Sequence, residues 1–190
     1  MKTVLTIGLL VFGAGWGTTS AAPLPEDGPY LKIGIGYSPY TRTALDLTDI
    51  ALVSNGFAPS MVVGVVWGRR HSLDVRWQTV YLNTSNSNRQ GYLAVTYTRY
   101  LQVQGPAPYL DVGFGLQHGP QVGSDTRRGD FETTDGIALT FGAGVRFSRK
   151  FEVAGDYAVG ASGRFFTSNN NFDFSHRELM FSIRYTLIGG

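Results

Sequence analysis

A strict alternation of apolar and polar residues toward the carboxyl end most constrains what this chain can fold into. Large apolar residues recur at alternate positions of three segments, 137–147, 151–159 and 178–187. A period of two places successive side chains on opposite faces of a β-sheet. The second face carries glycine, alanine and charged residues. Strands of about ten residues with this pattern are typical of a transmembrane β-barrel, which turns its apolar face outward to lipid.

The same alternation continues upstream and brings the number of predicted strands to eight. We predict strands at residues 30–40, 61–67, 71–82, 91–101, 109–117, 136–147, 151–159 and 178–187. The connections after the first, third, fifth and seventh strands are long and polar, and the others are short. Outer-membrane barrels alternate short periplasmic turns with long outer loops. The sequence therefore predicts an all-β fold, an eight-stranded antiparallel up-and-down transmembrane β-barrel.

The amino-terminal residues have the features of an export signal. Met1 and Lys2 form a short positive region, residues 4–12 are apolar, and residues 19–22 are small. The apolar run is too short to span a membrane as a helix and ends in small residues, as in a cleaved signal peptide. We therefore predict a signal peptide at 1–21, a barrel domain at 22–190, and localisation in the outer membrane of a Gram-negative bacterium.

The composition of the chain argues against several kinds of site and partner. The 190 residues include no cysteine, which excludes disulfides and thiolate metal sites. The formal net charge of +2, without a basic run, does not indicate a nucleic-acid partner. The mean hydropathy of -0.05 does not count against a membrane barrel, because alternating strands average out. No metal-ligand spacing or phosphate loop is present, so we predict neither metal nor cofactor.

The inward face is predicted to carry nine charged residues. They are Lys32, Asp74, Arg76, Asp111, Arg146, Glu152, Asp156, Glu178 and Arg184. Buried charges require partners, so we expect an ion-paired interior rather than a wide pore. The outward face and strand ends are predicted to carry an aromatic belt. Its members would be Tyr37, Tyr40, Trp67, Tyr81, Tyr97, Tyr100, Tyr109 and Tyr185.

A serine, a histidine and a carboxylate occur together at the start of the last strand, as Ser175, His176 and Glu178. Successive residues of a strand face opposite ways, so Ser175 and His176 are not expected to pair as nucleophile and base.

Most of the mature chain resembles the outer-membrane lipid A deacylases of the PagL type. The resemblance rests on residues 108–115, 141–147 and 164–169 and on a last strand that opens with Glu178. It implies an eight-stranded barrel that releases an ester-linked acyl chain from lipid A. The family motif is His-x-Ser-Asn, followed by an acid on the last strand. Ser168 and Asn169 match the Ser-Asn and Glu178 matches the acid, but Phe166 occupies the histidine position, and a serine without a base is a poor nucleophile.

Two principal hypotheses follow, and the sequence leaves open whether the protein is an enzyme. The first is a non-enzymatic outer-membrane barrel that contacts membrane lipid, lipopolysaccharide or another envelope protein through its long outer loops. The second is a lipid A acyl-ester hydrolase with Ser168 as nucleophile, Glu178 as orienting acid and His176 as a base folded back toward the serine. A soluble lipocalin-like barrel, with its aliphatic faces turned inward, is a third possibility.

Overall fold

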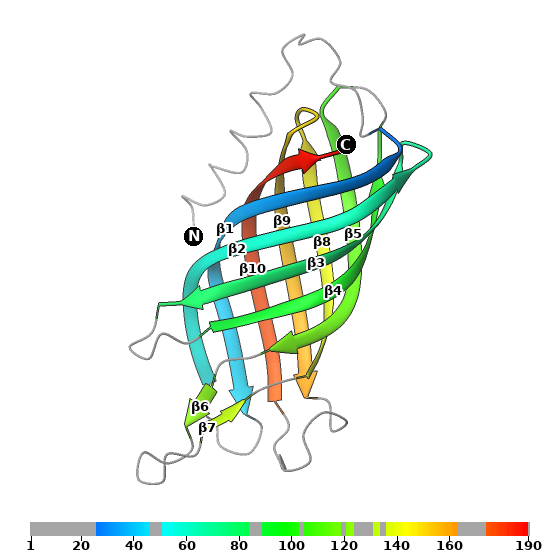
Figure 1. The fold of residues 1–190 in the computed structure, drawn as a ribbon. Helices are drawn as coiled ribbons and strands as arrows, with labels where there is room; N and C mark the ends of the chain where they lie inside the picture. The colour runs from blue at the N-terminus through cyan, green and yellow to red at the C-terminus, as the bar shows by residue number, and fades with distance from the viewer. Residues whose placement is uncertain are drawn as a thin grey trace.

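The computed structural model describes residues 26–45, 51–83, 89–102, 105–118, 121–123, 131–133, 136–162 and 174–189. These residues form one closed antiparallel β-barrel of eight strands and a separate two-stranded sheet (Figure 1). The predicted fold class is confirmed. Among the described residues, no helix is long and apolar enough to cross a membrane.

The barrel strands follow one another around the wall in chain order, as expected of an up-and-down barrel. They are β1 (Gly28–Leu45), β2 (Ala51–Trp67), β3 (His71–Leu82), β4 (Arg89–Tyr100), β5 (Ala107–His118), β8 (Gly136–Arg146), β9 (Phe151–Ser162) and β10 (Phe174–Ile188). The pairing of β1 with β10 closes the barrel. Closure leaves no sheet edge with unpaired backbone groups.

The first two strands are longer than predicted. Residues 41–60 were expected to form a loop, but β1 continues to Leu45 and β2 begins at Ala51. The polar Ser54-Asn55-Gly56 segment resembles a turn, yet Gly56 pairs with Ser38 on one side and Leu82 on the other. Cross-strand pairing on both sides overrides this local turn preference.

The connection between β5 and β8 also contains structure that was not predicted. Residues 118–135 were expected to be a charged loop. Within them β6 (Gln121–Gly123) and β7 (Phe131–Thr133) pair antiparallel. Figure 1 shows this small sheet at the end of the barrel where β1 and β9 finish.

At the opposite end of the barrel, short turns join neighbouring strands. Gly68 and Arg69 between β2 and β3 adopt positive φ angles of 58° and 55°. Two consecutive left-handed residues are what a tight hairpin of this kind requires. The predicted signal peptide, 1–21, lies outside the described residues.

Candidate functional site

The centre of the barrel interior is held by a network of buried ion pairs. Arg76 donates through Nη1 to Asp156 Oδ1 at 2.7 Å and through Nη2 to Asp111 Oδ2 at 3.2 Å. Asp156 also accepts a hydrogen bond from Arg184, which lies on β10. Because β3, β5, β9 and β10 each contribute one member, the network joins strands from different parts of the wall. The strand period places every one of these side chains inside.

A second group of buried charged residues extends the network toward the end of the barrel that has the short turns. Lys32 Nζ lies 2.7 Å from Glu152 Oε2, and the other carboxylate oxygen of Glu152 lies 3.7 Å from Arg184 Nη1. Nearby, Tyr30 donates to Asp74 Oδ2 at 2.8 Å. The predicted ion-paired interior is therefore confirmed, and each of the nine predicted inward residues is buried.

The half of the interior nearer the long connections is organised around Glu178. Gln78 Nε2 donates to Glu178 Oε1 at 3.0 Å, and Gln90 Nε2 donates to Glu178 Oε2 at 2.9 Å. Gln90 Nε2 also reaches Thr41 Oγ1 at 3.1 Å. The alternation that places Arg76 inside also places Gln78 there, and this prediction is confirmed. Gln90 was missed, because residues 83–90 were expected to form a loop and β4 already begins at Arg89.

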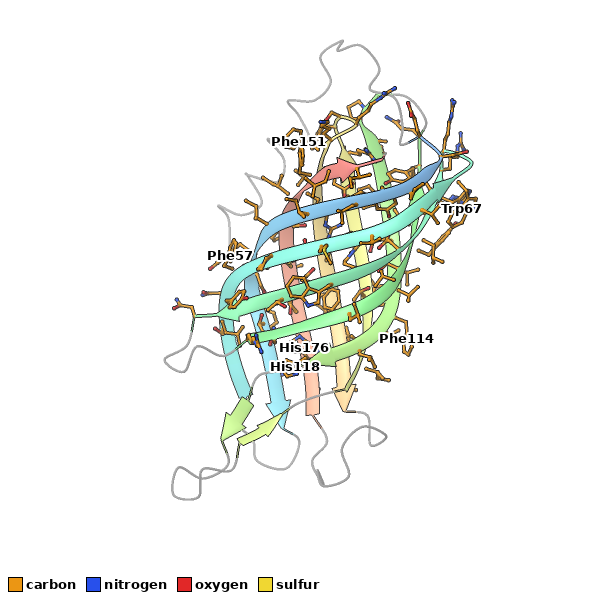
Figure 2. The ribbon with its side chains drawn as sticks, viewed as in Figure 1. Phe57, Trp67, Phe114, His118, Phe151 and His176 are labelled. Carbon is orange, nitrogen blue, oxygen red and sulfur yellow. The ribbon has the colours of Figure 1, made fainter. Side chains whose placement is uncertain are left out.

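The three proposed catalytic residues are only partly described. Ser168 lies outside the described residues, as do Asn169 and Phe166. His176 and Glu178 are both buried in the interior, with His176 Nε2 3.6 Å from Glu178 Oε2. Figure 2 shows His176 in the same half of the barrel as His118. The structure brings together the proposed base and the proposed acid, on the inward face of β10.

A surface depression of about 600 Å³ lies in the wall toward the long connections. Thr79 of β3 and Gly91 of β4 pair in register here and are buried. Outward-facing residues surround them, namely Trp77, Tyr81, Arg89, Leu93, Leu116 and His118. Apolar side chains with a cationic edge suit contact with an amphipathic molecule. No group of three His, Cys, Asp or Glu side chains that could hold a metal occurs in the described part of the chain.

The outward face of the barrel is almost entirely apolar. Phe57, Trp67, Phe114 and Phe151 are 44–57% exposed and lie outside the ribbon in Figure 2. Trp67 also stacks on His71 at 5.8 Å between ring centroids, and His71 Nδ1 lies 2.7 Å from the Tyr97 hydroxyl. This aromatic cluster marks the end of the barrel with short turns.

Two members of the predicted aromatic belt are inside instead. Tyr100 and Tyr109 are 1% and 3% exposed, and their rings lie 5.5 Å apart. Each shares its face with an inward polar residue two positions away, Thr98 and Asp111 respectively. The period of two therefore outweighs the preference of tyrosine for a membrane boundary. The belt prediction was wrong for these two residues.

Comparison with solved structures finds similarity to several bacterial proteins. Neisserial surface protein A aligns with a TM-score of 0.56 and 16% identity, over 83% of this chain and 96% of that one. The amino-terminal barrel of Pseudomonas aeruginosa OprF aligns at 0.49 and 10% identity, over 82% and 97%. P. aeruginosa OprG aligns at 0.49 and 10% identity, over 86% and 97%.

The likeness to neisserial surface protein A shows the fold. The chain is an eight-stranded barrel of the outer-membrane type. No protein-family model matches the chain, and no curated protein does. The resemblance to lipid A deacylases therefore gains no support from these comparisons beyond the shared barrel.

Proposed function

We propose that the protein resides in the outer membrane of a Gram-negative bacterium and acts there without catalysis, as an interaction protein. The outward face is the best support for the membrane location, because it is aliphatic and aromatic while every acidic residue of the barrel strands is buried inside. Soluble monomers rarely expose apolar patches larger than about 600 Å². A lipocalin-like barrel would show the opposite arrangement, with aliphatic side chains inside.

The long connections form the proposed interaction surface. The strand ends that they follow, such as those of β1 and β9, lie at the end of the barrel that carries β6 and β7 (Figure 1). This is the outer end in barrels with short periplasmic turns. The interior supports an interaction role rather than transport, because Arg76, Asp111, Asp156 and Arg184 cross it with paired charges. The partner would be lipopolysaccharide or another envelope protein.

Accessibility in whole cells tests the location. An epitope inserted between residues 124 and 130 should bind antibody on intact cells. The matched insertion after Gly68, in the short turn between β2 and β3, should bind only after the outer membrane is permeabilised. Recovery of the protein without detergent, or the reverse labelling of the two epitopes, would overturn the proposal.

Binding to the two partner classes is tested next. A variant lacking residues 124–130 is compared with the complete chain for retention of purified lipopolysaccharide and for crosslinking to envelope proteins in cells. The proposal expects at least one of the two to be lost in the deletion variant. Unchanged retention and unchanged crosslinking would show that this connection is not the interaction surface.

A second candidate is hydrolysis of a lipid A acyl ester. The observation in its favour is the 3.6 Å separation of His176 Nε2 and Glu178 Oε2. A carboxylate beside an imidazole can orient it and stabilise its charged form, as the acid of a serine-hydrolase triad does. Ser168 would then attack the ester carbonyl and pass its proton to His176. The ester C–O bond would break, the lipid A hydroxyl would leave with that proton, and water, deprotonated by His176, would hydrolyse the acyl-serine to release the fatty acid and restore Ser168. The inward position of the pair counts against access to a lipid in the surrounding leaflet.

Fatty-acid release from lipid A by purified protein decides between the candidates. Hydrolysis that is lost in Ser168→Ala and in His176→Gln, but kept in the neighbouring control Ser175→Ala, would establish the enzyme and overturn the non-catalytic proposal. No release above a protein-free blank would exclude the esterase.

A further inference from the structure

On the barrel wall, acidic residues face only inward, whereas some basic residues face outward. The five acidic residues of the barrel strands all point inward and are buried, namely Asp74, Asp111, Glu152, Asp156 and Glu178. Outward-facing charges within these strands are all arginines, namely Arg42, Arg89, Arg99 and Arg177. The inside is therefore nearly balanced, whereas the described outer wall carries positive charge without a compensating carboxylate.

Two of these arginines lie directly opposite each other. In the pair that closes the barrel, Arg42 of β1 faces Arg177 of β10. Thr41 points inward, as do His176 and Glu178, so the arginines between and beside them point outward. Directly opposed residues of antiparallel strands have Cβ atoms about 5 Å apart, and like charges at this spacing are destabilising.

Among the residues that the structure describes, no neighbour relieves this repulsion. Arg42 pairs with Val53 on its other side, and Arg177 pairs with Val159. The acidic residues of the four strands β2, β1, β10 and β9 are Glu152, Asp156 and Glu178, and all three lie inside. No ion pair joins Arg42 or Arg177 to a carboxylate among the residues that the structure describes.

The surroundings of the arginine pair are those of a lipid-facing wall. Val53 is 60% exposed and Val159 is 37% exposed. The next outward pair toward the middle of the barrel is Tyr40 with Leu179, and beyond it lies Tyr37 with Phe181. An anion bound at the pair would therefore sit at the outer end of an apolar strip. That is the arrangement of a lipid, whose headgroup is charged and whose chains are hydrocarbon.

We propose that Arg42 and Arg177 bind a phosphate group of lipopolysaccharide. The inference rests on the proposed location, because it requires the end with long connections to face outward. A guanidinium presents paired donors that match phosphate oxygens, and two guanidiniums at one spot turn a mutual repulsion into a shared attraction for the anion. The acyl chains of the same lipid would lie along Tyr40, Leu179 and Phe181.

Lipid retention by the refolded full chain tests the site. The protein is placed in phosphatidylcholine nanodiscs containing a low fraction of diphosphoryl lipid A, dephosphorylated lipid A or phosphatidylglycerol, and retained lipid is measured by native mass spectrometry. Diphosphoryl lipid A should be retained best. The Arg42→Ala/Arg177→Ala variant should lose about tenfold or more of this retention, since charge-assisted hydrogen bonds are removed.

The matched control is Arg99→Ala, which removes an outward arginine at the opposite end of the wall. It should retain diphosphoryl lipid A as the unmodified protein does. Diphosphoryl lipid A should also raise the unfolding midpoint of the unmodified protein but not of the double variant. Two results would overturn the phosphate site: the double variant retains diphosphoryl lipid A as well as the unmodified protein does, or the unmodified protein retains dephosphorylated lipid A as well as diphosphoryl lipid A. Equal retention of phosphatidylglycerol and diphosphoryl lipid A would instead show unselective anion binding.

If the protein is not an outer-membrane barrel, a different measurement shows it. Each variant is first checked for protease protection and for the heat-dependent gel shift of a folded barrel in phosphatidylcholine vesicles. A chain that does not insert contradicts the outer-membrane proposal. A chain that inserts normally but retains lipid without regard to phosphate contradicts only the arginine site.

Discussion

Arg76 and Asp156 are 80 residues apart in the chain and meet inside the barrel, with Arg76 Nη1 2.7 Å from Asp156 Oδ1. Both side chains are 2% exposed. Asp156 is also the partner of Arg184, so one carboxylate serves two buried guanidiniums. Removing it would leave two cations inside the barrel with fewer partners.

We therefore expect Asp156→Ala to destabilise the barrel by about 3–5 kcal/mol, the usual cost of breaking a buried ion pair by deleting one member. Urea unfolding in phosphatidylcholine vesicles measures this change. Glu26→Gln is the matched control, because it breaks the exposed pair of Glu26 and Arg149. That substitution should cost less than about 1 kcal/mol. Similar losses for the two variants would show that the interior network is not what stabilises the barrel.

The same network should obstruct ion flow. Arg76, Asp111, Asp156 and Arg184 lie across the middle of the interior, so the unmodified protein is expected to give only small, brief currents in a planar bilayer. The double substitution Arg76→Ala/Asp156→Ala removes a matched cation and anion and should raise the single-channel conductance severalfold. A large steady conductance in the unmodified protein would contradict the closed interior.

Much of the barrel was predictable because one physical rule repeats in every strand. The alternation gave the positions of β3 and of its inward Asp74 and Arg76, and the same rule placed Glu178 inside. Connection lengths then indicated which end has the short turns. Both signals are local, so they can be read from the chain without knowing which strands are neighbours.

What could not be predicted depends on partners distant in sequence. Residues 41–45 carry too few large apolar side chains to extend the alternation, and only their pairing with β10 and β2 reveals them as strand. The meeting of Arg42 with Arg177 follows from that register. It also depends on the irregularity between Tyr37 and Tyr40, which shifts β1 relative to β10. Of the candidate site, Ser168 lies outside the described residues, so its relation to His176 stays a prediction.

The close packing of Gly142 against the Asp111 carboxylate inside the barrel gives a third prediction. A Cβ on Gly142 would lie 2.5 Å from both carboxylate oxygens of Asp111, which is held by Arg76. Gly142→Ala should therefore displace Asp111 and cost about 1–3 kcal/mol, as overpacking of a tight interior does. Gly155→Ala is the control, since its Cβ would be no closer than 3.4 Å to another side chain. Equal unfolding midpoints for the two variants would contradict this close packing.

The outward face gives the last prediction, which depends on depth in the bilayer. Val112 lies in the middle of β5 and is 47% exposed, whereas Ile188 is the last residue of β10 and is 64% exposed. Val112→Arg should destabilise the folded barrel in vesicles by about 2–4 kcal/mol, because arginine is costly near the bilayer midplane. Ile188→Arg should cost no more than about 1 kcal/mol, because its guanidinium reaches water at the interface. A soluble barrel would show little difference between the two, since both side chains would already face water, so the contrast between these positions tests directly whether lipid surrounds this wall.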